Sequence, residues 1–229
     1  MKRALPFVII VGMLGAALFT AWYLKQSAAE TPRVIPRDSA APRNRAGAIK
    51  LGAEPPHTLG SPDAAVMLEE FADLECQSCG LLHPIMKTMK EEFGPNVVIV
   101  FREFPLVSNH PHALEAARVA EAAGLQGKFW EMHDLLYENQ KTWHDASDVQ
   151  PIFAEYATRL GLALDRFKQD LSGEIVIRRI ALDRERGYSI GVNSTPTVFL
   201  NGREVPLESM AADKLRALIS EQIKSAERK

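Results

Sequence analysis

The two cysteines of this 229-residue chain, Cys76 and Cys79, lie where a strand pattern gives way to a helical pattern. Residues 65–71 are mostly apolar and follow a cluster of turn residues, which predicts a strand. The helical pattern that the cysteines open is interrupted at Pro84. Residues 97–101 are then apolar throughout, as in a parallel strand covered on both faces. This order predicts a βαβ unit with the cysteines at the N-terminus of its helix.

Cysteines three positions apart at a helix N-terminus are suited to redox exchange. Only the thiolate reacts, and the unpaired N–H groups and positive dipole of a helix N-terminus favour an anion. We therefore predict that Cys76 is the attacking nucleophile and that Cys79, one turn further into the helix, is the resolving thiol. A purely structural disulfide is disfavoured, because so short a loop gains little from being closed.

A metal site is the alternative use of the two thiols. The chain has no second cysteine pair, and its histidines do not follow the spacing of a zinc finger. We therefore predict an enzyme that needs neither a bound cofactor nor a metal. An exported metal-binding or chaperone module that uses the thiols as ligands stays open as a function of a different class.

Helical patterns fill the chain from residue 111 to about residue 190, and strand character returns at 197–200. An Asn-Gly turn leads into a short strand at 203–205, and an amphipathic helix follows over 208–227. The helices predicted within the long segment cover 112–124, 128–139, 150–160, 165–171 and 174–189.

Two features of this helical segment are predicted to be structural. Phe129, Trp130, His133 and Tyr137 recur at helical spacing, which indicates packing in the core or between domains rather than a binding site. The charged run over residues 178–186 is predicted to be a solvated helix face.

Three segments resemble the DsbA-like branch of the thioredoxin superfamily: FADLECQSC, GKFWEMHDLLYENQ and GVNSTPTVFLNG. The resemblance extends over about residues 57–226. It implies an α/β thioredoxin fold in which an all-helical domain, at about 107–190, is inserted between the second and third strands. It also implies a thiol:disulfide oxidoreductase, which is an enzyme of protein disulfide exchange.

The resemblance extends to individual site residues. It implies that Thr195 and Pro196 form a cis-proline loop that faces the cysteines and binds the extended backbone of a substrate. A proline suits the start of a buried strand because it cannot donate to the strand ladder. The resemblance further implies that Glu70 assists proton transfer to or from the deeper thiol, while Glu69 and Glu75 compete with it for any electrostatic role.

The dipeptide between the cysteines departs from the family pattern. This chain has Gln77 and Ser78, whereas the family often has proline followed by histidine or tyrosine. Neither side chain adds positive charge, so the thiolate lacks one stabiliser. We therefore expect a weaker oxidant than the strongest members of this type.

The N-terminal region predicts a membrane anchor and a linker. Residues 5–24 contain no charge and follow a basic start, and as a helix they would span about 30 Å, the thickness of the hydrocarbon core of a bilayer. We predict a signal anchor over 1–24, although Ser27-Ala28-Ala29 also fits a cleavage site. Residues 25–56 contain five prolines and no apolar periodicity, which predicts an extended linker.

The charge of the folded region and the expected location of the protein limit the classes of function that fit the sequence. Residues 1–50 hold eight of the 27 basic side chains and two of the 29 acidic ones, so 19 basic and 27 acidic side chains remain in 51–229. An acidic folded region argues against nucleic acid as a partner. We predict a single-pass membrane protein with its catalytic domain on the periplasmic side, where it donates disulfides to exported proteins. The alternative is a reductase or isomerase, and either enzyme needs a membrane redox partner: a quinone-linked oxidase or a reductant.

Overall fold

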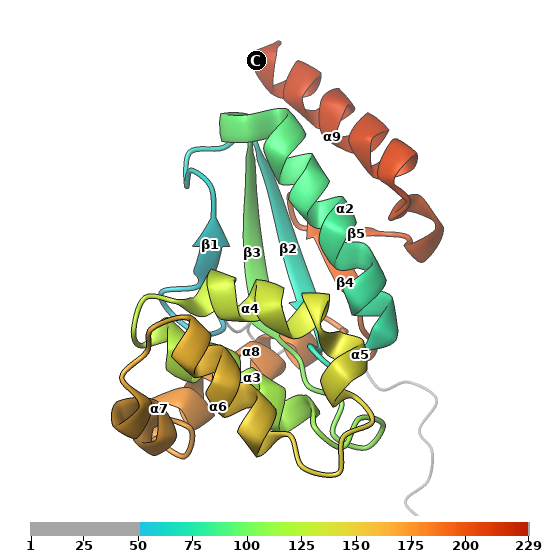
Figure 1. The fold of residues 1–229 in the computed structure, drawn as a ribbon. Helices are drawn as coiled ribbons and strands as arrows, with labels where there is room; N and C mark the ends of the chain where they lie inside the picture. The colour runs from blue at the N-terminus through green and yellow to red at the C-terminus, as the bar shows by residue number, and fades with distance from the viewer. Residues whose placement is uncertain (1–50, 229) are drawn as a thin grey trace, which may run out of the picture. The chain divides into compact units, whose positions relative to one another are not determined.

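The computed structural model describes residues 51–228, so the predicted anchor at 1–24 and most of the predicted linker at 25–56 lie outside the described residues. None of the helices within 51–228 is long and apolar enough to span a membrane. The described residues form a five-stranded sheet in the order β1-β3-β2-β4-β5 (Figure 1). Its strands are β1 (His57–Leu59), β2 (Val66–Ala72), β3 (Val97–Glu103), β4 (Thr197–Leu200) and β5 (Arg203–Val205).

The centre of the sheet is the predicted βαβ unit. β2 and β3 run parallel, and α2 (Gln77–Phe93) with the short 3₁₀ helix η2 (Gly94–Asn96) connects them. The predicted interruption at Pro84 is wrong, because α2 continues through this proline. Pro84 is on the exposed side of α2, whereas Met86 and Met89 on the other side are buried, so packing holds the helix together across the missing N–H.

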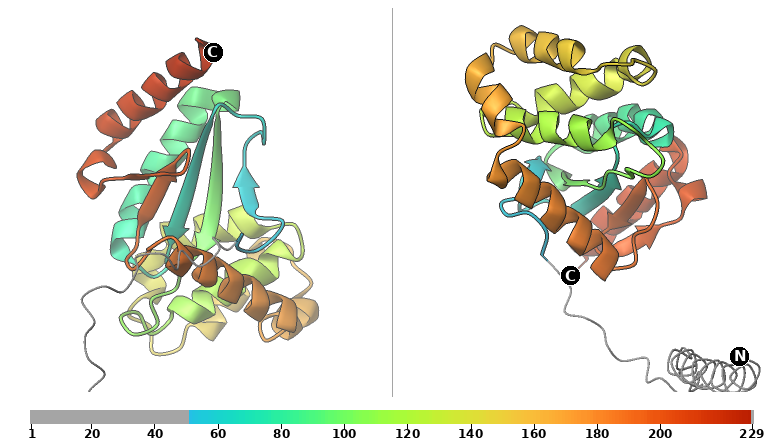
Figure 2. Two further views of the ribbon diagram at one scale, coloured as in Figure 1. Left: turned by 180° about the vertical axis from the view of Figure 1, so that it is seen from behind. Right: turned by 90° about the horizontal axis from the view of Figure 1, so that it is seen from below.

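Helices cover both faces of the sheet. On one face α2 and α9 (Ala212–Glu227) form a core with the strands, which includes Leu68, Ile99 and Leu215. On the other face lies α8 (Glu174–Ser189), seen crossing the sheet in Figure 2. α8 approaches closely at Gly187, where a Cβ would lie 2.6 Å from the ring of Phe104. Before α9 the chain makes one more 3₁₀ turn, η3 (Leu207–Ser209).

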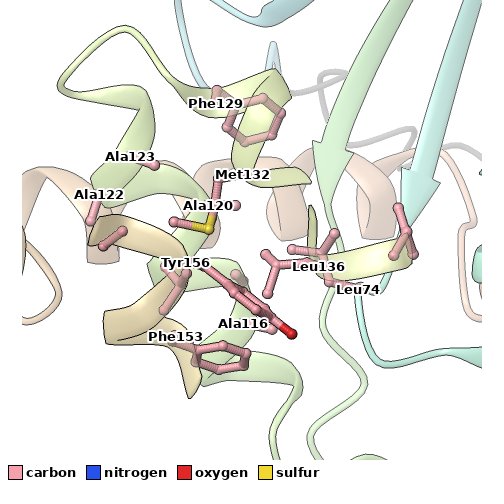
Figure 3. Close-up of a cluster of buried hydrophobic side chains, with 14 of the residues drawn as sticks. Leu74, Ala116, Ala120, Ala122, Ala123, Phe129, Met132, Leu136, Phe153 and Tyr156 are labelled. Atoms are coloured by element: carbon pink, nitrogen blue, oxygen red, sulfur yellow. The ribbon is translucent and has the colours of Figure 1, made fainter. Parts of the chain in front are cut away.

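Six helices stand between β3 and β4, which confirms the expected helical insertion in an α/β fold. α8 is the last of them, and the others are α3 (Ala113–Gly124), α4 (Phe129–Glu138), α5 (Gln140–Trp143), α6 (Gln150–Arg159) and α7 (Leu164–Asp170). Their buried side chains form one core, in which the small alanines of α3 allow the larger side chains of α4 and α6 to approach (Figure 3). The side chains labelled there include Ala116, Ala120, Phe129, Met132, Leu136, Phe153 and Tyr156.

The charges of α8 are solvated only in part. Arg178 and Glu185 are exposed, as predicted for residues 178–186, but the prediction is wrong for Asp183 and Arg186. Asp183 is 1% exposed, and its carboxylate accepts hydrogen bonds from Arg102 Nη1 at 2.9 Å and from the backbone N–H of Ala53 at 2.7 Å. Arg186 pairs with Glu69 at 2.7 Å. These pairs form because α8 covers a sheet face that carries charges of its own. The hydrogen bond from Ala53 to Asp183 also holds the chain against the domain at Ala53, four residues before β1 begins.

Candidate active site

The cysteines lie at the carboxyl end of β2, where a tight turn leads into α2. Cys76 is the N-cap residue of α2, and its N–H donates to the carbonyl of Asp73 at 3.1 Å. Asp73 is fully buried and its carboxylate shapes the turn: Oδ1 accepts from the N–H of Glu75 at 2.8 Å and Oδ2 from the N–H of Leu106 at 2.8 Å. The predicted strand–cysteine–helix junction is therefore confirmed.

The two thiols differ sharply in acidity. A hydrogen bond from Cys79 lowers the pKa of Cys76 to about 5 despite burial, with smaller contributions from Thr195 and from the N–H groups of Cys79 and Ser78. Burial raises the pKa of Cys79 well above its usual value, and the hydrogen bond to Cys76 and the charge on that thiol add to the effect. Cys76 is 7% exposed and Cys79 is fully buried. The neighbouring thiol therefore lowers the pKa of Cys76 more than either N–H group of the helix N-terminus does.

The loop that precedes β4 and contains Thr195 and Pro196 lies beside Cys76. β4 pairs with β2, which brings the loop to the cysteines although it follows them by more than a hundred residues. The predicted cis peptide bond between Thr195 and Pro196 is confirmed. In the thiol form Cys76 Sγ lies 3.5 Å from the carbonyl oxygen of Thr195. In this thiol form the buried Thr195 hydroxyl has no hydrogen-bond partner among residues 51–228, so it is free to donate to the sulfur once Cys76 is a thiolate, and this side chain lowers the pKa of Cys76.

Glu70 lies on the face of the sheet that α2 covers. It is 3% exposed, and burial raises its pKa to about 8. Its negative charge would raise the pKa of Cys79 further. The two competing carboxylates have other partners: Glu69 pairs with Arg102 and Arg186, and Glu75 accepts a hydrogen bond from the N–H of His112 at 2.6 Å.

Two residues of the site are not among those predicted from the sequence. His110 Nδ1 lies 2.7 Å from Asp73 Oδ2. Burial opposes its charged form, but the hydrogen bond to Asp73 and the negative charges of Asp73, Cys76 and Glu75 raise the pKa of His110. The protonated form of His110 is therefore favoured near the Cys76 thiolate, whereas the dipeptide between the cysteines offers no cationic side chain.

Gln140 of α5 is the second such residue. Its side-chain amide donates to the carbonyl oxygens of Leu74 at 2.8 Å and Cys76 at 3.0 Å. Both His110 and Gln140 reach the site from the helical insertion or the loop before it, more than thirty residues away in the sequence. No local motif identifies His110, whereas Gln140 ends the segment GKFWEMHDLLYENQ, which resembles the family but gave no role for this residue.

Comparisons with known proteins agree with this architecture. Residues 53–221 match the family described as Thioredoxin. The oxidised structure of BdbD from Bacillus subtilis is 20% identical, with a TM-score of 0.66 over 74% of this chain and 93% of that chain. The structure of alpha-DsbA1 from Wolbachia pipientis is 20% identical, with a TM-score of 0.64 over 77% of this chain and 94% of that chain.

Among curated proteins, Na(+)/H(+) antiporter NhaA 1 of Mycolicibacterium gilvum is 36% identical over 172 residues. That match covers 73% of this chain but 27% of the relative. The chain spans about a quarter to a third of the length of the curated relatives it matches. The family match, in contrast, covers most of the chain and includes the sheet, the cysteine pair and the helical insertion. The chain therefore belongs to the thioredoxin family and has the DsbA-like form of its fold.

Proposed function

We propose that this protein is a thiol:disulfide oxidoreductase that donates disulfides to exported proteins. The observation that carries the proposal is the pairing of two unlike thiols beside the Thr195–Pro196 loop. Cys76 has a lowered pKa, and the buried Cys79 has a raised pKa. In the oxidised enzyme the two sulfurs form a disulfide. A substrate thiolate attacks the sulfur of Cys76, forms a mixed disulfide and releases Cys79.

The leaving thiol requires a proton because its pKa is high. Glu70 has a pKa of about 8 and is protonated at neutral pH, so it can donate a proton to Cys79. A second substrate thiolate then attacks the substrate sulfur of the mixed disulfide. The substrate leaves with a new disulfide, and the enzyme keeps two electrons on Cys76 and Cys79 until a redox partner accepts them.

The low pKa of Cys76 supports the donor direction. A stable thiolate is a good leaving group, and it favours the reduced form of the enzyme over the disulfide. Disulfide transfer to a substrate is therefore favourable in free energy, and it continues as long as a partner reoxidises the pair. Reduction or isomerisation of substrate disulfides is the alternative use of the same site and requires a reducing partner.

An apolar groove beside Pro196 supports a peptide substrate. It has a volume of about 160 Å³ and lies between α2 and the segment that precedes α9. Leu81 and Leu207 are each 69% exposed at its edge, which suits contact with apolar side chains of an extended peptide. The residues that line the groove are Ser78, Leu81, Leu82, Ile85, Pro196, Leu207, Met210 and Ala211.

We further propose that a helix over residues 5–24 anchors the protein in the cytoplasmic membrane, with residues 30–229 on the periplasmic side. The supporting observation is the run of twenty uncharged residues after a basic start. This arrangement would place the cysteines beside a membrane redox partner such as a quinone-linked oxidase. A mature protein that begins at Glu30 and leaves the membrane in alkaline carbonate would contradict the anchor.

Trapping of mixed disulfides tests the exchange mechanism. In cells that express Cys79→Ser, Cys76 can attack substrate disulfides but cannot be released, so covalent complexes with exported proteins should accumulate. Cys76→Ser should form none, because the remaining thiol, Cys79, is buried and its raised pKa keeps it protonated. Non-reducing electrophoresis after acid quenching separates the two results. Equal trapping by both variants, or trapping by Cys76→Ser alone, would show that the assignment of the two thiols is wrong.

A further inference from the structure

A second pocket lies between α2, α4 and the face of the sheet that carries Glu70. Its volume is about 270 Å³. α2 contributes His83 to its wall, and α4 contributes His133 and Asp134. The proposed disulfide exchange uses none of these three side chains.

The three side chains bring potential ligand atoms together. Asp134 Oδ1 lies 2.9 Å from His83 Nε2 and 3.0 Å from His133 Nδ1, and the three ligand atoms lie within 4.8 Å of one another. A tetrahedral zinc ion with bonds of about 2.0–2.1 Å holds its ligand atoms about 3.3 Å apart. Small side-chain movements would therefore seat an ion among them. Each imidazole would coordinate through a lone pair and carry its proton on the opposite ring nitrogen.

The surrounding packing fixes both imidazoles. His83 is 8% exposed and His133 is 4% exposed. The ring of His133 packs edge-on against Phe101 at 4.7 Å, and the ring of His83 stacks on Tyr137 at 5.1 Å. Side chains that are already held in place lose little conformational entropy when they bind an ion.

Asp134 is the outermost of the three ligands and is one-third exposed. Lys87 Nζ lies 3.1 Å from its Oδ2. This ion pair orients the carboxylate and leaves Oδ1, the oxygen between the two imidazoles, for a cation.

Glu70 gives an independent indication of a ligand in this pocket. Its side chain lines the pocket, and its Oε1 is buried with no hydrogen-bond partner among residues 51–228. A buried carboxyl oxygen of this kind needs a water or an ion to compensate for its lost hydration. A water bound to a metal ion in the pocket would supply that hydrogen bond, as is common around metal sites.

We propose that His83, His133 and Asp134 bind a Zn²⁺ ion, with a water in the fourth position facing Glu70. Two imidazoles and one carboxylate suit zinc, whereas Ca²⁺ and Mg²⁺ prefer oxygen ligands alone. Because the ligands come from α2 and α4, the ion joins the helix that carries the cysteines to the helical insertion. The ligands lie fifty residues apart in the sequence, so no spacing motif predicts them.

Zinc titration of a cysteine-free protein tests the proposal. The full-length chain with Cys76→Ser and Cys79→Ser removes the thiols as competing ligands, so the result does not depend on the proposed exchange activity. Isothermal titration with Zn²⁺ should give one site per chain with a Kd in the micromolar range or below. At a free Zn²⁺ concentration of about 100 times Kd, Tm should rise by about 5–10 °C.

Variants of the ligands and of a distant histidine sharpen this test. Asp134→Asn keeps the size of the side chain, and both it and His83→Gln should raise Kd by about tenfold or more. His144→Gln removes a half-exposed histidine outside the pocket and should leave Kd unchanged. Absence of saturable binding in the cysteine-free protein overturns the proposal. A Kd that is unaffected by Asp134→Asn and His83→Gln, or that rises equally in His144→Gln, also overturns it.

Discussion

The acidity of Cys76 predicts the pH dependence of its reactivity. Hydrogen bonds from Cys79 and Thr195 outweigh burial and bring the pKa of Cys76 to about 5. Since only the thiolate reacts, alkylation of the reduced protein should accelerate about tenfold per pH unit below pH 5 and level off above about pH 6. Rates measured with iodoacetamide and mass spectrometry check this profile. A midpoint near the free-thiol value of about 8.5 would contradict it.

The buried carboxyl of Glu70 predicts a loss of stability at alkaline pH. Burial raises its pKa to about 8 in the folded state, against 4.5 for an ordinary glutamate side chain. The folded state therefore holds a proton that the unfolded chain releases. The stabilisation is complete below pH 4.5 and is lost as pH rises towards 8. The loss is on the order of a few kcal/mol.

Glu70→Gln removes this titration while keeping the size of the side chain. In the cysteine-free background, the free energy of unfolding of Glu70→Gln minus that of its parent should grow between pH 4.5 and about 8 and then stay constant. Urea unfolding at a series of pH values measures the difference. Glu204→Gln changes an exposed carboxylate and should give a difference that is nearly independent of pH. A constant difference for Glu70→Gln would contradict the raised pKa.

At the scale of elements, α5 ties the helical insertion to the turn that carries Cys76. The amide of Gln140 donates to two carbonyl oxygens of that turn, and a Cβ added at Gly80 would lie 2.6 Å from its Oε1. Gln140→Ala leaves these carbonyls without their donor, so the free energy of unfolding should fall by about 1–3 kcal/mol. Urea unfolding checks this value, and Lys141→Ala, an exposed neighbour, should have little effect. Equal losses in the two variants would rule out a specific role for Gln140.

The elements with strong local signals were the ones that the sequence predicted best. The bounds of β4, β5 and α8 match the prediction. The turn between β4 and β5 contains Asn201 and Gly202, both with positive φ, which is the conformation that this dipeptide favours. The short elements β1 and α5 were missed, because three or four residues do not establish a period.

The charges of α8 show where a sequence pattern stops being informative. A run of alternating charges fits a solvated helix, and it equally fits a helix whose charges pair with a sheet. Only the fold shows that Asp183 faces Arg102 and that Arg186 faces Glu69. The same limit applies to His110, because its partner Asp73 lies 37 residues away in the sequence.

At the scale of the whole molecule, the redox potential depends on groups from several layers of the fold. α2 supplies the helix N-terminus and Cys79, the loop before β4 supplies Thr195, and the loop before α3 supplies His110. All of them favour the Cys76 thiolate and hence the reduced form. Burial of Cys76 opposes them, and Gln77 and Ser78 add no charge.

We expect these contributions to place the potential of the Cys76–Cys79 pair between about −120 mV, the value of DsbA, and about −270 mV, the value of thioredoxin. The pair would then be oxidising enough to donate disulfides when a membrane partner keeps it oxidised. Equilibration with glutathione buffers, followed by alkylation of the free thiols, measures the potential. A value near that of DsbA would mean that His110 and the hydrogen bonds to Cys76 stabilise the thiolate enough to compensate for the lack of a positive charge at Gln77 and Ser78. A value at or below that of thioredoxin would favour the reductase function over the donor function.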